Sequence, residues 1–213
     1  MDIRNFLKEH NLDYLLVNTT NEFLVEYNTL EENSLYKLTG FSGSTGQAVV
    51  TPRTIYLFVD GRYHIQAQQE TDPKNITVIK LASWKDFWAK LREVVPNGSE
   101  LGIFSKKNSL RIVNNFAKYY KVKLIDNDPF DCDSKNFTEK NVNIDDKLSG
   151  MSTSEKVHQI CHIADLKDDE MIYLTDLDDV SYLFNLRNYE IPYRAKIRAK
   201  ALIYDGSAKF FPP

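Results

Sequence analysis

The chain has 213 residues and a mass of 24.7 kDa, which exceeds one average domain and suits one large or two small domains. Its 42% hydrophobic and 12% aromatic residues, with only 8 Gly and 7 Pro, suffice for a full core and exclude wholesale disorder. The 27 basic and 30 acidic side chains give a net charge of -3, so the chain as a whole is not attracted to nucleic acid or an anionic membrane. We therefore expect a globular protein of two modules, without a nucleic-acid or membrane partner.

The cysteines and the N-terminus predict a cellular compartment. Cys132 and Cys161 are too few for a disulfide framework, and neither has a second cysteine at the CxxC spacing, so a reducing compartment fits best. The charged side chains of Asp2, Arg4 and Lys8 leave no room for the apolar stretch of a secretory signal. The longest apolar runs are strand-sized, far below the roughly 20 residues that span a bilayer. These observations predict a cytoplasmic protein without a membrane-spanning segment.

Helix and strand patterns alternate through the first 125 residues. Apolar residues at helical spacing predict a first helix that carries Ile3, Phe6 and Leu7, and the same spacing predicts helices at 62–70, 84–95 and 109–120. Short apolar runs predict strands at 14–17, 47–51, 54–59, 76–81, 101–104 and 122–125. Pro52-Arg53 joins the second and third strands as a hairpin, and segment 21–27 is expected to be helical or irregular. Such alternation predicts an α/β domain with helices packed on the faces of a sheet.

The second half begins the same way. Residues 126–146 are rich in Asp, Asn and Ser and are interpreted as a linker. Ser152 and Glu155 have the spacing of a capping box before a helix to about residue 166, and Asp176 can cap a helix at 177–186. Strands are predicted at 171–175, 199–204 and 208–211. The shared order of helix, strand, helix, turn and hairpin predicts a structural repeat, with a first domain at 1–143 and a partial second domain at 144–213.

Three groups of residues have spacings that call for comparison with known sites. The glycine-rich stretch 40–46 lacks GxGxxG and a phosphate-binding lysine, so it is interpreted as a close-packed turn before the hairpin. His158 and His162 have the spacing of two metal ligands, but Gln159 replaces the glutamate of an HExxH helix, which favours a solvated helix flank. The aspartates at 126, 128, 131 and 133 lack the spacing of a calcium loop. The residues alone thus predict no catalytic residue and no metal site.

Cations alternate with small apolar residues near the C-terminus. On a strand, Arg194, Lys196, Arg198 and Lys200 would share one face. The favoured interpretation is an edge strand protected by charge, and the alternative is a docking face for an acidic surface. The acidic residues between 165 and 179 provide such a surface within the same chain.

Two motifs of the first domain resemble a known family. Residues 38–51 contain Gly-Phe-Ser-Gly-Ser, and the sequence Asp-Gly-Arg-Tyr follows the hairpin at 60–63. At this spacing they resemble the N-terminal domain of Xaa-Pro aminopeptidases, in the creatinase/prolidase group, and Glu26-Tyr27 resembles that family's segment before the glycine turn. Residues 177–187, LDDVSYLFNLR, resemble a helix of the family's second domain. Phe58 stands where many relatives carry tryptophan, and Asn188 replaces the glycine after Asn-Leu-Arg.

The resemblance implies a three-domain metallopeptidase. A domain with a mixed β-sheet flanked by helices, and a second, similar domain, would precede a catalytic domain with two metal ions, commonly manganese, held by two aspartates, a histidine and two glutamates. Its substrate is a peptide with proline at the second position, and it releases the residue before the proline. No cofactor is expected in these 213 residues, and the N-terminal domains are expected to shape a homo-oligomer and the access of substrate.

The resemblance also implies roles for individual residues. Arg62, Tyr63 and Arg187 are expected near the substrate. Structural motif residues are Gly40, Phe41, Gly43, Ser44, Gly46, Asp60 and Gly61. Position alone also favours a projecting Arg62, because it follows a strand end at the rim of the sheet. The alternative is an arginine locked in a core salt bridge with Asp60 or a nearby acid.

Two functions are left open. The first is the non-catalytic N-terminal portion of a Xaa-Pro aminopeptidase. The alternative is a peptidase-like protein-binding module without activity, comparable to the histone-chaperone domains that share this architecture. Arg62 within an intact Asp-Gly-Arg-Tyr motif favours the first.

Overall fold

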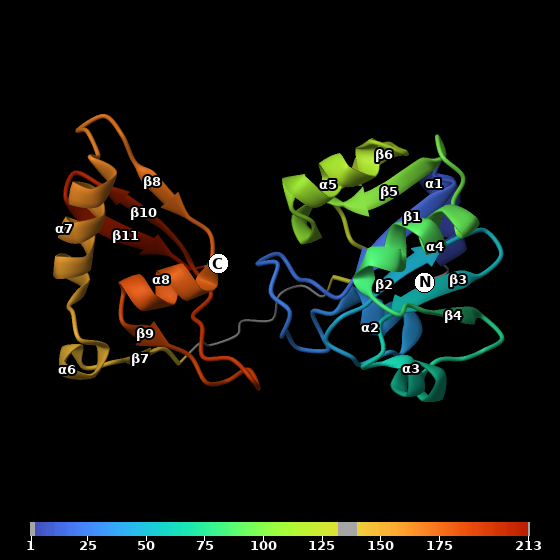
Figure 1. The fold of residues 1–213 in the computed structure, drawn as a ribbon, viewed down its shortest axis with the longest axis horizontal. Helices are drawn as coiled ribbons and strands as arrows, with labels where there is room; N and C mark the ends of the chain where they lie inside the picture. The colour runs from blue at the N-terminus through green and yellow to red at the C-terminus, as the bar shows by residue number, and fades with distance from the viewer. Residues whose placement is uncertain (1–2, 132–139, 213) are drawn as a thin grey trace. The chain divides into compact units, whose positions relative to one another are not determined.

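The structure, a computed structural model, describes residues 3–131 and 140–212 (Figure 1). The chain forms two compact units, residues 1–135 and 136–213. This division precedes the domain boundary expected after residue 143. The reason is the short strand β7 (Val142–Asn143), which pairs with β9 (Leu186–Arg187) and thereby joins the second unit.

The first unit contains the helices and strands that the alternating pattern predicts. Its helices are α1 (Ile3–Glu9), α2 (Ser34–Thr39), α3 (His64–Glu70), α4 (Phe87–Val94) and α5 (Leu110–Ala117), with 3-10 turns η1 (Trp84–Asp86) and η2 (Ser105–Lys107). Its strands are β1 (Tyr14–Asn18), β2 (Gln47–Val50), β3 (Ile55–Val59), β4 (Ile76–Lys80), β5 (Glu100–Phe104) and β6 (Lys121–Ile125). Segment 21–27 is irregular.

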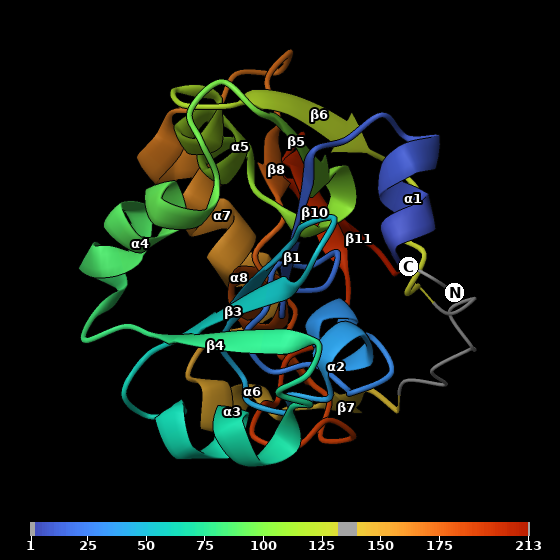
Figure 2. The same cartoon turned by 90° about the vertical axis from the view of Figure 1, so that its right-hand side faces the viewer.

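The strands of the first unit form one mixed sheet in the order β4-β3-β2-β1-β5-β6. Figure 2 shows its two edge strands, β4 and β6, with β3, β1 and β5 between them. Strand β2 is antiparallel to both of its neighbours, which confirms the predicted hairpin of β2 and β3. The pairs β3–β4, β1–β5 and β5–β6 are parallel. All strands except β2 therefore run in one direction, and their carboxyl ends lie at the same edge of the sheet.

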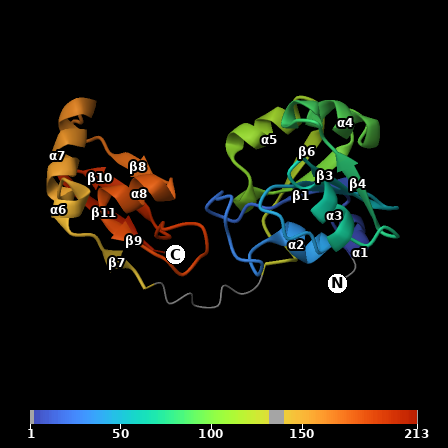
Figure 3. The ribbon, with the colours of Figure 1, turned by 60° about the horizontal axis from the view of Figure 1, so that its bottom comes forward.

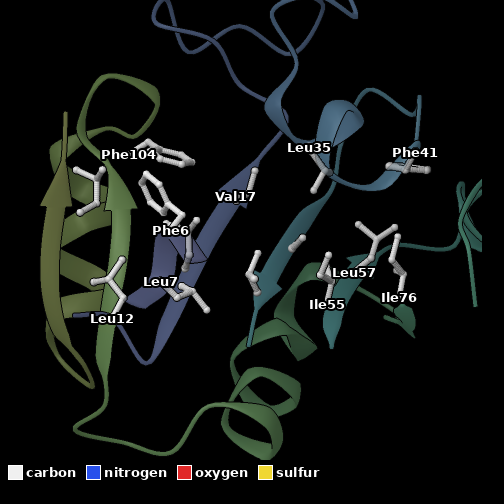
Figure 4. Close-up of a cluster of buried hydrophobic side chains, with 14 of the residues drawn as sticks. Phe6, Leu7, Leu12, Val17, Leu35, Phe41, Ile55, Leu57, Ile76 and Phe104 are labelled. Carbon is white, nitrogen blue, oxygen red and sulfur yellow. The ribbon is translucent and has the colours of Figure 1, made fainter. Parts of the chain in front are cut away.

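Helices cover both faces of this sheet, as the layered α/β prediction requires (Figure 3). Helices α1, α2 and α3 pack on one face, where Phe6, Leu7 and Leu35 meet Val17 and Leu57 of the strands (Figure 4). Helices α4 and α5 pack on the other face through an apolar cluster that includes Leu16, Val49, Phe58, Phe87, Leu91 and Phe116. Because both faces of the central strands are buried, these strands appear in the sequence as nearly continuous apolar runs.

The second unit repeats the order of the first half of the first unit. It contains α6 (Asp146–Ser149), α7 (Thr153–Ala164), β8 (Ile172–Leu174), α8 (Leu177–Leu183), β10 (Lys200–Tyr204) and β11 (Ser207–Phe211). The antiparallel sheet β11-β10-β8 has the order and strand directions of β3-β2-β1. The predicted capping box of Ser152 with Glu155 and the Asp176 cap are both present. Helix α8 ends at Leu183, before the predicted residue 186, and Asn185 follows with a positive φ.

The basic segment 194–200 is not the strand that its alternation predicts. Residues 194–199 have no regular secondary structure, and β10 begins only at Lys200. The backbone N–H of Ile197 donates to the hydroxyl of Ser181 (2.9 Å) instead of a neighbouring strand. Arg198 is buried, so the four cations do not share an exposed face. Lys196 contacts Asp178, which is one of the acidic residues expected to face this segment.

The linker begins later than its composition predicts. Asp128 is buried, and its Oδ2 lies 2.8 Å from Nζ of Lys107. Asp131 accepts a hydrogen bond from the same ammonium group, and Asp126 accepts one from the hydroxyl of Ser105. These contacts hold residues 126–131 against the first unit. The ammonium group of Lys107 compensates the negative charges of Asp128 and Asp131. Cys132 and Asp133 lie outside the described residues.

Candidate functional site

Arg62 lies at the edge of the sheet where the parallel strands end. Strand β3 ends at Val59, and a hydrogen bond from Tyr63 N to Asp60 O (2.9 Å) closes the following turn. The turn returns Arg62 to the Asp60 carboxylate, where Nε donates to Oδ1 (3.1 Å) and Nη2 donates to Oδ2 (2.9 Å). Arg62 is thus ion-paired with Asp60, as the alternative interpretation requires in part. The arginine does not lie in the core, however, because 59% of its side chain is exposed, whereas Asp60 is buried.

Asp60 accepts hydrogen bonds on both carboxylate oxygens. Besides the two bonds from the guanidinium, its Oδ1 accepts from Arg62 N (3.1 Å) and its Oδ2 accepts from Trp84 Nε1 (2.8 Å). The side-chain hydrogen bond from Arg62 is the main reason why the pKa of Asp60 falls from 3.8 to about 2, although burial opposes the shift. The hydrogen bond to Asp60 likewise raises the pKa of Arg62 above its usual value. Both groups are therefore charged at neutral pH.

Tyr63 connects this turn to two other loops. The Arg62 guanidinium lies 5.1 Å from the centroid of the Tyr63 ring, a cation–π arrangement. The Tyr63 hydroxyl lies 2.8 Å from Ser44 Oγ, and Ser44 also donates to Glu26 Oε1 (2.9 Å). Glu26 Oε1 is 4.0 Å from Arg62 Nη1. The structure thus places Arg62 against Tyr63 and adds Glu26 and Trp84 to this site.

The glycine-rich stretch 40–46 is a close-packed turn around one buried ring. Gly40 ends α2 with φ +78, and an added Cβ there would lie 3.0 Å from Glu70 O. A Cβ on Gly43 would lie 2.2 Å from the tip of the Phe41 ring, and a Cβ on Gly46 would lie 2.9 Å from Leu35 Cδ2. Phe41 is fully buried and fills the space beneath the turn. These glycines permit close approach to the ring, so the turn is a structural element that presents Ser44.

Gly61 differs from these glycines. An added Cβ would meet nothing within 4 Å in the described residues. The packing of this unit therefore does not explain a glycine at this position.

Arg187 belongs to the second unit, whereas Arg62 and Tyr63 belong to the first. Its Nη1 donates to the backbone oxygens of Ser181 and Leu186, at 2.8 Å each. Lys156 donates in the same region to Tyr182 O (2.7 Å), and burial, together with the charge of Arg187, lowers the pKa of Lys156. The two cations thus satisfy carbonyl groups at the C-terminal end of α8.

Sequence reasoning missed the place of Glu26 and Trp84 in the site. Trp84 reaches Asp60 because β3 and β4 are parallel neighbours, with Val59 opposite Lys80. Trp84 could have been found only by predicting that β3 and β4 pair. In that pairing η1 follows β4 at the same edge of the sheet where Arg62 follows β3. For Glu26, the sequence offered only the resemblance of Glu26-Tyr27 to a family segment. That resemblance did not indicate which residues Glu26 would contact.

His158 and His162 are exposed on α7, which confirms the prediction of a solvated flank. Within residues 3–131 and 140–212, no group of three or more His, Cys, Asp or Glu side chains is placed to hold a metal ion. No helix in this part of the chain is long and apolar enough to cross a membrane.

The Creatinase/Prolidase N-terminal domain family matches residues 2–131, and a second family with the same description matches residues 133–212. The chain belongs to the creatinase/prolidase N-terminal domain family. The resemblance of the glycine turn and the Asp-Gly-Arg-Tyr motif is thereby confirmed. So is the mixed α/β fold expected of a creatinase N-terminal domain.

Curated relatives of this creatinase/prolidase chain are aminopeptidases. A probable Xaa-Pro aminopeptidase P of Coprinopsis cinerea is 29% identical over 222 residues, which cover 98% of this chain and 35% of the relative. Xaa-Pro aminopeptidase 1 of Dictyostelium discoideum is 24% identical over 90% of this chain and 33% of its own length. The chain therefore spans about a third of the length of these relatives.

A solved structure has the same fold. The X-prolyl aminopeptidase of Caenorhabditis elegans, a cytosolic enzyme with a di-nuclear active site, matches with a TM-score of 0.80 at 24% identity. The match covers 95% of this chain and 35% of that enzyme. At this identity, the likeness shows the fold of the creatinase/prolidase chain and not its activity.

Proposed function

We propose that this chain is the non-catalytic N-terminal portion of a Xaa-Pro aminopeptidase, which releases the N-terminal residue that precedes proline. Membership of the creatinase/prolidase N-terminal domain family and the aminopeptidases among its relatives support the proposal. The chain corresponds to a third of those relatives, which leaves room in them for a separate catalytic domain. In this proposal, the two N-terminal units shape the oligomer and the access of peptide to the active site.

The geometry of Arg62 is the observation that carries the proposal. Its guanidinium is exposed, yet Asp60 holds both Nε and Nη2. The protons of Nη1 and the second proton of Nη2 stay available to an oxygen atom of a bound peptide. The ion pair with Asp60 occupies one edge of the guanidinium, so it does not account for the exposure of the rest of the group.

The charges around Arg62 indicate which oxygen fits. The carboxylates of Asp60 and Glu26 lie near one guanidinium, so the three groups carry a net charge of -1. This charge disfavours a carboxylate or phosphate as the ligand. A neutral peptide carbonyl, which accepts hydrogen bonds without adding negative charge, fits better. We propose that Arg62 donates to such a carbonyl, with Tyr63 supporting the guanidinium. That Arg187 of the second unit lies near the substrate is a separate proposal, which rests on the resemblance of residues 177–187.

The metal ions and the cellular setting belong to the same proposal. The described residues hold no cluster for a metal ion, so we assign the two divalent ions, manganese or a similar metal, to a domain outside this chain. The di-nuclear active site of the C. elegans enzyme supports this assignment. A cytoplasmic location is proposed because that enzyme is cytosolic. The substrate would be a peptide with proline at the second position, and the enzyme a homo-oligomer.

A protein-binding module without activity is the second candidate. The sheet of the second unit favours it, because Tyr173, Tyr204 and Phe211 are large and exposed on its strands. An aromatic surface of this kind is common where proteins associate.

The coding sequence beyond residue 213 distinguishes the two candidates. The aminopeptidase proposal requires the two aspartates, the histidine and the two glutamates of a dinuclear site in the following domain. A reading frame that ends without these ligands favours the binding module. This chain alone, incubated with manganese and an Xaa-Pro peptide, should leave the peptide uncut, because it lacks the metal-bound water that acts as nucleophile. Chelator-sensitive cleavage by this chain would contradict the assignment.

The substitution Arg62→Ala tests the site in a protein that includes the catalytic domain. It should lower kcat/KM by about tenfold or more, because a hydrogen bond to a charged group contributes about 1.5–3 kcal/mol. The melting temperature should fall to a smaller extent, because the backbone N–H of residue 62 and the indole of Trp84 still donate to Asp60. Arg111→Ala, on an exposed position of α5, is the control and should alter neither quantity. Normal kinetics combined with a large loss of stability would assign Arg62 a structural role.

A further inference from the structure

The side chain of Arg62 is exposed but held in one conformation, and this conformation requires a physical cause. A surface arginine normally samples many rotamers, and the loss of this side-chain entropy opposes its fixation. Arg62 is 59% exposed but has both Nε and Nη2 bound to one carboxylate. Within the turn, the backbone N–H of Arg62 holds Oδ1 of that carboxylate (3.1 Å), and burial limits its movement. The terminal torsion of aspartate is nevertheless soft, and the described residues of the turn supply no second fixed donor to Oδ2. A donor from outside the turn is needed to fix that oxygen.

We propose that Trp84 is this donor, a positioning residue that holds Arg62 in place by fixing Asp60. Its indole Nε1–H donates to Asp60 Oδ2 at 2.8 Å. The bond comes from a different element, η1, and not from the turn that contains Arg62. This inference rests on the proposed function in one respect, namely that Arg62 faces a bound peptide.

The indole is well placed to serve as a fixed point. Ser83 and Asp86 form a capping box that shapes η1, and the Trp84 ring packs on Phe87 at 5.8 Å between centroids. The backbone N–H of Leu81 donates to Val59 O (2.9 Å), so the ends of β3 and β4 lie side by side. Two strand ends thereby set the distance between the indole and the carboxylate.

The indole N–H of Trp84 and the apolar part of its ring make different contacts. Its ring joins the apolar cluster beneath α4, and a phenylalanine would preserve much of this packing. Only the indole N–H reaches Asp60. Trp84→Phe therefore removes the positioning contact and retains most of the structural one. Trp88→Phe is the matched control, because within the described residues the Trp88 ring packs on Phe87 and Phe116 without a hydrogen bond from its N–H.

NMR of this chain tests the proposal without any peptide. In the wild type, the Nε–H of Arg62 should exchange slowly with water. Trp84→Phe should speed this exchange on the order of tenfold, the scale of one hydrogen bond to a charged group. The pKa of Asp60 should rise from about 2, since Trp84 is one of the donors that lower it. Trp88→Phe should leave both quantities unchanged, and Asp60→Asn should speed the exchange further.

A measurement on the wild type does not depend on how a variant folds. The indole N–H resonance of Trp84 should shift during acid titration with the same midpoint, about 2, as the Asp60 carboxyl. The resonance of Trp88 should not follow this midpoint. A Trp84 resonance that ignores the titration of Asp60 overturns the proposal. So does an Arg62 exchange rate that Trp84→Phe leaves unchanged in a folded protein.

The proposed function fails by a different result. If Trp84→Phe loosens Arg62 but Arg62→Ala leaves kcat/KM intact in the longer enzyme, the positioning role holds and the peptide contact does not.

Discussion

At the scale of single residues, Lys107 makes the most consequential contact of the first unit. Its side chain is 5% exposed, and its ammonium contacts Asp128, Asp131 and the hydroxyl of Ser34. Burial disfavours the charged form, but the carboxylates outweigh it and hold the pKa of Lys107 above its usual value. Asp128 is similarly buried, with 3% of its side chain exposed, so its charge depends on the lysine for compensation. The first unit therefore depends on this pair to keep residues 126–131 in place.

Lys107→Met should accordingly destabilise the protein strongly. The substitution leaves the Asp128 carboxylate buried without its partner, which costs about 3–5 kcal/mol. Urea unfolding gives the free energy, and proteolysis should become faster near residue 131. Lys121→Met is the matched control, because its pair with Glu100 is exposed and spans 3.7 Å, so its loss costs at most about 1 kcal/mol. Equal effects of the two substitutions would show that the buried pair has no special weight.

At the scale of elements, the glycine turn and the Asp-Gly-Arg-Tyr turn differ in how much space surrounds their glycines. Gly43→Ala puts a Cβ 2.2 Å from the buried Phe41 ring, and the overpacked turn should lose about 1–3 kcal/mol. Gly61→Ala adds a Cβ to open space and should change stability by less than about 0.5 kcal/mol. Thermal unfolding of both variants compares them directly. A Gly61 variant as unstable as the Gly43 variant would contradict the packing described here.

The sequence predicted the regular elements well because each has one dominant period. Strands such as β3 are continuous apolar runs, and α7 carries its own capping box. The prediction of a strand at 194–199 was wrong because an irregular segment can show the same alternation of charged and apolar residues. Here Ile197 and Ala199 enter the core without forming a strand. The start of the linker was placed too early because the Lys107–Asp128 pair joins positions that are distant in the sequence. The local composition of residues 126–131 gives no indication of this pair.

The candidate site was only partly predictable for the same reason. The Asp-Gly-Arg-Tyr motif located Arg62 and Tyr63, since both lie in one turn. Trp84 and Glu26 reach the site from other elements, through strand pairing and a loop contact that only the fold determines. The substrate role of Arg62, Tyr63 and Arg187 stays a prediction.

At the scale of the whole molecule, the repeat explains what the second unit has in common with the first. Both units begin with helix, strand and helix before an antiparallel hairpin, which the sequence predicted from the order of elements. In the first unit, α4 and α5 cover the second face of the sheet. In the second unit, the described helices α7 and α8 pack on one face, through Val157, Val180 and Leu183 against Ala201 and Ile203. The half-domain interpretation of residues 144–213 stays a prediction.

The other face of this sheet leads to the last prediction. Residues Ala201 and Ile203 point to α7 and α8, so Leu202 and its cross-strand partner Tyr173 point away. Phe211 lies on the same face, opposite Lys200. Exposed aromatic side chains on a sheet face favour association. Lys200 and Lys209, which pair with Phe211 and Leu202, share this face, so their ammonium groups must extend to the margin of any contact. We therefore expect this chain to self-associate through the exposed aromatic side chains of this sheet.

Sedimentation at high protein concentration measures this association. The wild-type chain should form a dimer or a larger species, and the double substitution Tyr173→Lys with Phe211→Lys should shift it to monomer, because it removes both aromatic rings from the contact and adds two charges to it. Tyr193→Lys is the control, since Tyr193 is 89% exposed but lies outside the sheet. A strictly monomeric wild type would show that this face needs no cover, and the interpretation of the second unit as half of a domain would then be wrong.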